Sequence, residues 1–252
     1  MKYKTIMLIP DTQFEPGKSV KHMNYAGQAA KEWGVDCVVQ IGDYNDHPSS
    51  CKYDKDKPGI LGSRNIRADY EIGFRGNEEF EAGLGNHSCR RILTRGNHDE
   101  RPRLLAQTIP AISGLVEEYE DRFENMGWEV YPYQEPVKVS GVYYSHMFTR
   151  TTAGKSSAMS VRSGASSAKA QLQANLMSCT AGHSPGFQYT ELPTEEGLRM
   201  SMIAGSFYPH KMKYPGPQGN KHFQGIIIKH MLKPGTYDFE KISLTRLKRM
   251  YG

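Results

Sequence analysis

The 252-residue sequence predicts an α/β protein that forms a single domain, and three observations support this prediction. In the first half of the chain, short apolar segments alternate with segments of helical periodicity, which indicates β-α-β units. In the second half, short apolar segments bounded by Pro and Gly predominate, which is typical of β-strands. No internal repeat or low-complexity linker divides the chain, so we expect one domain over residues 1–252.

The first half is expected to contain three strands, each followed in the chain by a helix. The strands are rich in Ile, Val and Leu, and we expect them at 4–10, 36–41 and 91–94. The helices are expected at 19–33, 66–84 and 100–120, the last with an interruption at Pro110. Gly34 is expected to end the first helix, and a polar loop is expected from residue 42 to about residue 62.

The second half is expected to form a second, largely antiparallel sheet. Its strands are expected at 128–133, 137–139, 142–145, 178–182, 200–204, 223–229 and 236–243. Residues 148–169 are rich in Ser, Thr, Gly and Ala, and we expect this segment to start as a loop and to become a helix.

Composition and charge exclude some classes of protein. The net charge of +5 permits a polyanionic substrate such as nucleic acid, but many unrelated proteins share it. The apolar runs are too short to span a bilayer, and the one before Asp11 fits a first strand better than a signal peptide. These short runs also predict no membrane partner. The four cysteines lack CxxC or zinc-type spacing, so we expect reduced thiols and a cytoplasmic location.

Polar residues that can bind metal ions follow the predicted strands. Asp11 follows the first strand, Asp43 follows the second and Asn97 follows the third. His146 and His183 follow two later strands. Because ligand sites of open α/β sheets form outside the carboxyl ends of the strands, we expect these five side chains to converge.

The types of these residues indicate the class of metal ion. Two carboxylates, one amide oxygen and two imidazoles, without a thiolate, suit Mn, Fe, Zn or Ni better than a soft metal. We therefore expect one or two divalent ions, with Mn favoured and Fe, Zn, Ni or Mg as alternatives. Asp43 lies between the other ligands in the sequence, so it is the natural bridge between two ions.

The order of these motifs resembles that of the calcineurin-like metallophosphoesterase superfamily. The motifs are D-x-x at Asp11, G-D-x-x-D at 42–46, G-N-H-D at 96–99, a lone His146 and G-H at 182–183. The resemblance covers about residues 6 to 185, and residues 205–220 are loosely similar to phage-encoded members. It implies a four-layer α-β-β-α sandwich of two facing mixed β-sheets.

The resemblance also implies a role for each site residue. Asp11 would bind the first metal ion and Asp43 would bridge the two ions. Asn97, His146 and His183 would complete the site of the second ion.

The resemblance further assigns an acid to the reaction. His98 would act as the general acid near the leaving-group oxygen, and Asp46 would orient its ring.

The sequence departs from the family pattern at two positions. The family usually has D-x-H in the first motif, where this chain has Gln13, and G-H-x-H in the last, where it has Pro185. Both missing histidines belong to the first metal ion, so we expect that site to be weaker, differently ligated or empty. The candidate replacement ligands are Gln13 and, as an imidazole, His210, His47 or His222, of which His210 is favoured.

A basic segment between His146 and His183 is a candidate for substrate binding. Its basic residues are Arg150, Lys155, Arg162 and Lys169. We expect the first three to contact a phosphate group, because cationic loops beside phosphate sites commonly bind the substrate. The alternative is an ordinary solvated loop.

These features predict a metal-dependent phosphoesterase that hydrolyses phosphate mono- or diesters with a metal-bound hydroxide. A nucleic acid or nucleotide is the expected substrate, so a phosphodiesterase or nuclease is favoured. If the protein is phage-encoded, we expect it in the cytoplasm of the host cell. One alternative is a non-catalytic nucleic-acid-binding module on a decayed phosphoesterase site. A protein phosphatase is a weaker alternative, because His47 and Pro48 replace the R-G that follows Asp46 in that branch. The sequence leaves the oligomeric state open.

Overall fold

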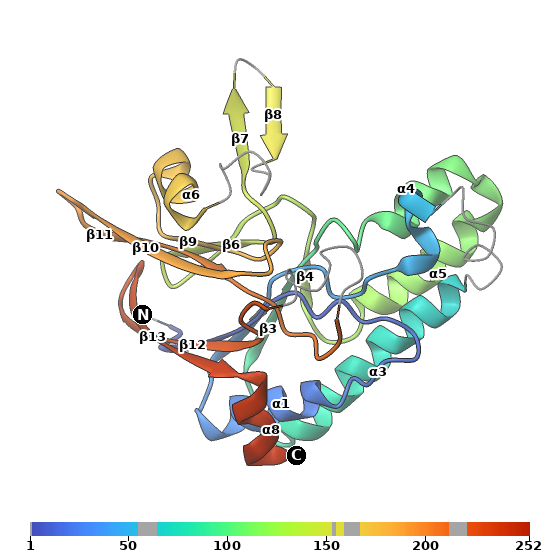
Figure 1. Cartoon of the computed structure of the whole chain (residues 1–252), viewed down its shortest axis with the longest axis horizontal. Coiled ribbons are helices and arrows are strands. Elements are labelled where there is room, and N and C mark those ends of the chain that lie inside the picture. The colour runs from blue at the N-terminus through green and yellow to red at the C-terminus, as the bar shows by residue number, and fades with distance from the viewer. Residues whose placement is uncertain (1, 55–64, 153–154, 159–166, 212–220) are drawn as a thin grey trace.

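The computed structural model describes residues 2–54, 65–152, 155–158, 167–211 and 221–252. In these ranges the chain forms an α/β protein with two mixed β-sheets, a two-stranded sheet and six α-helices (Figure 1). The expected alternation of strands and helices in the first half is confirmed, because each of the first three strands is followed by a helix.

The larger sheet has six strands in the order β13-β12-β1-β2-β3-β4. Its strands are β1 (Thr5–Ile9), β2 (Cys37–Gln40), β3 (Arg90–Thr94), β4 (Glu129–Tyr131), β12 (Gly225–Lys233) and β13 (Thr236–Ser243). Strands β1 to β4 pair in parallel, whereas β12 pairs antiparallel with both β1 and β13. The last two strands of the chain therefore extend the sheet that the first strands begin.

The smaller sheet has five strands in the order β10-β11-β9-β6-β5. Its strands are β5 (Val137–Val139), β6 (Val142–Ser145), β9 (Cys179–Ala181), β10 (Phe187–Thr194) and β11 (Gly197–Ala204). The two outer pairs are antiparallel and the two inner pairs, β11 with β9 and β9 with β6, are parallel. The expectation of a largely antiparallel second sheet is thus wrong, because a crossover through helix α6 (Ala168–Asn175) joins β6 to β9.

Two hydrophobic cores lie on the two faces of the larger sheet. Side chains alternate along β1, so Met7 and Ile9 belong to one core and Ile6 and Leu8 to the other. The first core packs against helices and the second against the smaller sheet, so the two sheets face each other. Helix α6 packs on β10 and β11 of the smaller sheet.

The remaining helices lie on the side of the larger sheet away from the smaller one, or at one end of it (Figure 1). They are α1 (His22–Glu32), α3 (Ile66–Leu84), α4 (Arg101–Thr108), α5 (Ser113–Glu124) and α8 (Leu244–Tyr251). The predicted interruption at Pro110 is confirmed, because a short 3₁₀ turn at Pro110–Ile112 separates α4 from α5. In the part of the chain that the structure describes, no helix is long and apolar enough to cross a bilayer.

Four elements differ from the sequence-based expectations. Strand β10 and helix α8 were not expected, and residues 148–169 contain a hairpin of β7 (Thr149–Thr152) and β8 (Lys155–Ala158) rather than a loop. Helix α8 starts at a Ser243 cap, whose side chain accepts a hydrogen bond from the amide of Arg246 at 3.2 Å. None of these strands and helices is longer than eight residues, so their sequences contain too few repeats for a periodic pattern to be detected.

Candidate metal centre

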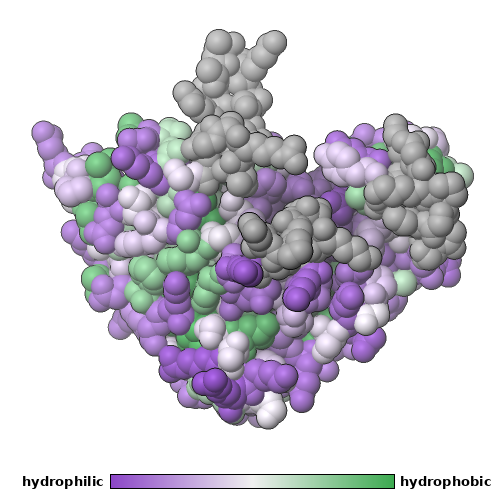
Figure 2. Space-filling view, viewed as in Figure 1, coloured by the Kyte–Doolittle hydropathy of each residue, from purple (hydrophilic) through white to green (hydrophobic). Residues whose placement is uncertain are grey.

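Loops at the carboxyl ends of five strands meet at one edge of the two facing sheets. Asp11, Asp43 and Asn97 follow β1, β2 and β3 of the larger sheet. His146 and His183 follow β6 and β9 of the smaller sheet. The surface between α6 and α4 is recessed and carries hydrophilic side chains, as Figure 2 shows. The five residues are thus brought together from both sheets.

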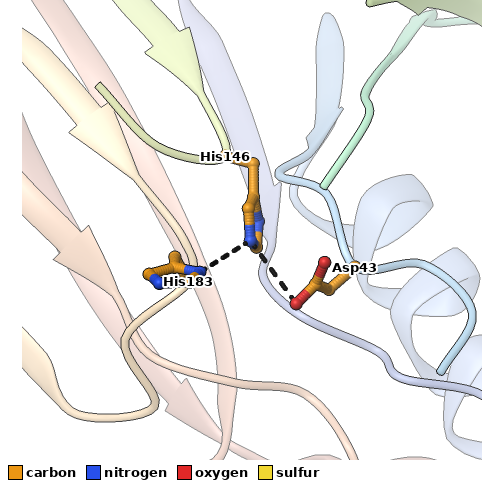
Figure 3. Close-up of side chains that lie close together, drawn as sticks. All are labelled: Asp43, His146 and His183. Carbon is orange, nitrogen blue, oxygen red and sulfur yellow. Dashed lines mark hydrogen bonds and ion pairs between the residues drawn. The ribbon is translucent and has the colours of Figure 1, made fainter. Parts of the chain in front are cut away.

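Four ligand atoms converge on one point of this edge. Figure 3 shows three of the side chains, with His146 Nε2 3.4 Å from Asp43 Oδ2 and 3.2 Å from His183 Nδ1. Asn97 Oδ1 adds a fourth atom, 3.1 Å from His146 Nε2 and 2.9 Å from His183 Nδ1. Two ligands that are each about 2.1 Å from one ion lie about 3.0 Å apart at a right angle and about 3.4 Å apart at a tetrahedral angle. The spacing therefore fits a single divalent ion.

His146 has its metal-facing nitrogen fixed by a hydrogen bond on the other side of the ring. Its Nδ1 lies 2.9 Å from the carbonyl oxygen of Ile41, so Nδ1 carries the proton and Nε2 has a free lone pair. Burial lowers the pKa of His146, although the nearby Asp43 opposes this effect. A Cβ atom at Gly42 would overlap the His146 ring, which explains the glycine before Asp43.

Asp43 is the carboxylate that contacts both His98 and His146. Its Oδ1 accepts a hydrogen bond from the amide of His98 at 2.9 Å, and its Oδ2 faces His146. Burial opposes its charge, but the imidazoles of His146 and His98 and the amide hydrogen bond lower its pKa to about 2. Asp43 is therefore an anion at neutral pH. A Cβ atom at Gly96 would overlap the Asp43 backbone and carboxylate, so the G-N-H-D motif needs its glycine.

Asp11 lies beside the four-atom cluster rather than within it. Its Oδ1 accepts a hydrogen bond from the amide of His183 at 3.2 Å and lies 3.8 Å from His146 Nδ1. Burial and the charge of Asp43 raise the pKa of Asp11 well above its usual value. The two carboxylates are thus shifted in opposite directions, which is common in functional sites.

Three residues of this edge have left-handed backbone conformations, which side chains other than glycine rarely adopt. The φ angles are +41° for Gln13, +46° for Asp43 and +64° for His183. Backbone strain of this kind concentrates at functional sites.

The ring of His183 is neutral at neutral pH. Burial lowers the pKa of His183 to about 4, and the neighbouring His146 adds to this effect. A neutral ring can bind a metal ion.

The proposed acid, His98, is oriented by Asp46. His98 Nδ1 lies 2.8 Å from Asp46 Oδ1, and because a carboxylate only accepts, Nδ1 carries the proton. The His98 Nε2 atom lies 3.8 Å from Asp43 Oδ2, at the edge of the metal cluster. Burial opposes the charge of Asp46, but the hydrogen bond from His98 and the charge of Arg101 lower its pKa.

Two further residues position the loops of the site, although the pattern of polar residues after strands does not point to them. The buried carboxylate of Asp99 accepts hydrogen bonds from the amides of Gly96, Tyr44 and Asn45 at 2.7, 3.1 and 3.2 Å. It thereby ties the loop after β3 to the loop after β2. Arg101 contacts both His98 and Asp46. Asp99 is the last residue of the G-N-H-D motif, so the motif could have indicated its role in the site.

The candidate replacement ligands differ in their surroundings. Gln13 is buried, and its Oε1 has no hydrogen-bond partner in the described part of the chain. Neither ring nitrogen of His210 has such a partner there either. His222 Nε2, in contrast, lies 3.1 Å from the Tyr208 hydroxyl and 3.0 Å from the Ser206 hydroxyl.

One group of His, Cys, Asp and Glu side chains that could hold a metal ion is found among the described residues, and it consists of Asp43, His146 and His183. The candidates His47 and His210 lie outside this cluster. The structure therefore brings together the ligands expected for the second ion, and no such group of His, Cys, Asp and Glu side chains that includes Asp11 is found among the described residues.

The candidate substrate residues lie on the β7–β8 hairpin or outside the described residues. Arg150 is on β7, opposite Ser157, and Lys155 is on β8, opposite Thr152. The hairpin projects from the body of the protein directly after His146 (Figure 1). Arg162 falls in the segment 159–166, outside the described residues.

Comparison of the sequence with protein-family models and with curated proteins finds no match. The chemistry of the site is therefore inferred from its side chains alone. It offers one carboxylate, one amide oxygen and two imidazoles to a divalent cation, and an imidazole–carboxylate pair beside them. Such a combination can bind an anionic substrate through a metal ion and transfer a proton next to it.

Proposed function

We propose that the protein is a metal-dependent phosphoesterase of the calcineurin-like type, which hydrolyses phosphate mono- or diesters. The observation that carries the proposal is the convergence of Asp43, Asn97, His146 and His183 at metal-ligand spacing. The two facing mixed sheets, with helices on their outer sides, agree with the four-layer α-β-β-α sandwich of that superfamily. The proposed substrate class is a nucleic acid or nucleotide.

Mn²⁺ is the proposed ion, because mixed oxygen and nitrogen donors without thiolate suit it, and Fe, Zn, Ni or Mg are alternatives. When bound, the ion would activate a water molecule and neutralise charge on the phosphate group. Asp43 and Asn97 supply oxygens, and His146 and His183 supply neutral nitrogens.

His98 is the proposed general acid. Its Nδ1 proton is engaged by Asp46, so Nε2 is the atom that would pass a proton to the leaving-group oxygen. Asp46 keeps the ring in this orientation. The amide hydrogen bond from His98 to Asp43 keeps the acid next to the metal ligands.

The proposed enzyme binds one ion tightly. Asp11 and the amide oxygen of Gln13, which has no hydrogen-bond partner among the described residues, are the proposed ligands of the first, more weakly bound ion, with His210 as a further candidate. Pro185 can offer no side-chain ligand. Elemental analysis is therefore expected to find closer to one than two ions after dialysis.

The test is Mn²⁺-dependent hydrolysis of a monoester, a diester, single-stranded and duplex DNA, and RNA. The variants Asp43→Ala and His98→Ala are expected to lose at least about 99% of the activity, since acid and metal groups each contribute about 10² or more. His230→Ala is the control, because this histidine lies on β12 beside Glu240, away from the site. Wild-type rates in both site variants would overturn the proposal.

A second candidate function is a non-catalytic nucleic-acid-binding module. The observation that favours it is the absence of both first-site histidines, with Gln13 and Pro185 in their places. This alternative predicts salt-sensitive DNA or RNA binding without turnover of any phosphoester. The same substrate panel distinguishes the two functions.

A further inference from the structure

Arg101, at the start of α4, places its guanidinium group against His98, at the edge of the candidate metal centre. Its Nη2 lies 2.7 Å from His98 Nε2, and that ring nitrogen lies 3.8 Å from Asp43 Oδ2. The distance from Arg101 Nη2 to Asp43 Oδ2 therefore cannot exceed the sum of these two distances. A positive charge that close to a phosphoesterase site is within reach of a bound phosphate group.

The hydrogen bonds show which side of His98 the arginine occupies. Nδ1 of His98 donates to Asp46, so Nε2 presents its lone pair, and Arg101 Nη2 donates to it. In the proposed reaction, Nε2 faces the leaving-group oxygen of the substrate. Arg101 therefore occupies, in this structure, the place next to the acid that a substrate oxygen would take.

The guanidinium is held in place by hydrogen bonds that do not use all of its N–H donors. Its Nη1 donates to the backbone oxygen of Asp46 at 2.6 Å and contacts Asp46 Oδ1 at 3.3 Å. The amide of Arg101 donates to the carbonyl of His98 at 3.1 Å. Arginine has five N–H donors, and the hydrogen bonds to described residues use Nη1 and Nη2 but not Nε. Donors therefore remain for an anion.

We propose that Arg101 binds the phosphate group of the substrate and helps to determine which phosphoester is accepted. This inference rests on the proposed phosphoesterase function. In the proposed reaction Nη2 leaves His98 Nε2, and Nε2 takes up a proton from solvent and passes it to the leaving-group oxygen that replaces Nη2. The guanidinium donates to a non-bridging oxygen of the same phosphate. A dianionic monoester carries one more negative charge than a monoanionic diester, so it gains more from the positive charge of Arg101.

The competing role is purely structural. In that case Arg101 only fastens α4 to the loop after β2 through Asp46, and its loss would disturb the orientation of His98. A structural role predicts a lower kcat and a lower thermal midpoint. A phosphate-binding role predicts weaker binding of phosphate itself.

The experiment measures phosphate binding and catalysis separately on the full-length chain. Isothermal titration calorimetry with inorganic phosphate is performed with and without Mn²⁺ on wild type, Arg101→Lys and Arg101→Met. KM and kcat are measured in parallel for p-nitrophenyl phosphate and bis(p-nitrophenyl) phosphate. Arg103→Met is the matched control on the same helix, because Arg103 pairs with Glu120 at 3.1 Å and Glu124 at 3.0 Å.

Arg101→Met is expected to weaken phosphate binding by about tenfold or more and to raise KM more for the monoester than for the diester. Arg101→Lys should give an intermediate value, because it keeps the charge but loses the paired donors. The control Arg103→Met should bind phosphate as wild type does.

Wild-type phosphate affinity and KM in Arg101→Met would overturn the inference, whether or not kcat falls. If Arg101→Met fails to fold, Arg101→Lys decides, since unchanged phosphate affinity and KM in that variant also contradict paired binding. If wild type hydrolyses no ester, the phosphoesterase proposal fails. The calorimetric comparison still decides whether Arg101 binds phosphate.

Discussion

Lys229 is a lysine that is fully buried between the two sheets. Its Nζ donates to the Thr180 hydroxyl at 2.5 Å and lies 3.9 Å and 4.9 Å from the ring centres of Tyr237 and Tyr144. Among the described residues no carboxylate forms an ion pair with it, and burial lowers the pKa of Lys229 well below its usual value. The amine is therefore less protonated in the folded protein than in the unfolded chain.

This difference predicts a pH-dependent stability. Between the folded pKa of Lys229 and the unfolded pKa of about 10.4, the unfolded chain binds more protons, so its contribution to stability rises with pH. That contribution changes by at most about 1.4 kcal/mol per pH unit. Lys229→Met should remove this slope, as measured by urea unfolding between pH 6.5 and 8.5. The exposed Lys241→Met should keep it, and an unchanged slope in Lys229→Met would contradict the assignment.

The residues of the candidate site were predictable to different degrees. Asp43, Asn97 and His146 could be selected from the sequence because each directly follows a strand. The contact of Arg101 with His98 depends on the turn before α4, which brings residues three positions apart into contact. Sequence patterns do not specify such a turn, so Arg101 was missed.

At the scale of elements, helices α1 and α3 approach each other unusually closely. A Cβ atom at Gly83 of α3 would overlap the backbone of Asn24 and lie 3.0 Å from the amide of Gln28, both on α1. A Cβ atom at Gly27 would likewise overlap the backbone of Phe80. Glycine at these positions therefore permits the contact between the two helices.

Gly83→Ala is expected to destabilise the protein by about 1–3 kcal/mol, because the added methyl group forces the helices apart. Helix propensity alone would predict the opposite, a gain of about 1 kcal/mol. Gly114→Ala in α5 is the matched control, since no atom lies within 4 Å of its added Cβ, and its stability should be unchanged or slightly higher. Equal free energies of unfolding for the two variants, measured with urea, would refute the packing argument.

Elements with strong periodicity were predicted well and short ones were not. Helix α3 begins and ends where it was expected, at Ile66–Leu84, because its apolar face repeats over many turns. Strand β10 (Phe187–Thr194) lacks a buried face, since its residues are exposed or only partly buried, so no alternating pattern marks it. Partners of strands were less predictable still, since β12 pairs with β1 from the opposite end of the chain.

At the scale of the whole molecule, the candidate metal centre connects the two sheets. Asp43 and Asn97 belong to loops of the larger sheet, and His146 and His183 belong to loops of the smaller one. His146 Nε2 lies 3.1–3.4 Å from a ligand atom of each of the other three residues. An ion bound there would join the sheets at one edge of their shared core. Such binding stabilises the folded state, because unfolding separates the ligands.

Removal of the ion should therefore lower the thermal midpoint. At an ion concentration of about 100 Kd, binding adds about 2.7 kcal/mol, which corresponds to about 5–10 °C for a chain of this size. Differential scanning calorimetry with Mn²⁺ or with EDTA should show this shift in wild type and in His230→Ala, but not in Asp43→Ala. Identical midpoints for wild type under both conditions would mean that no ion links the sheets, because an ion held by ligands from both must be released on unfolding.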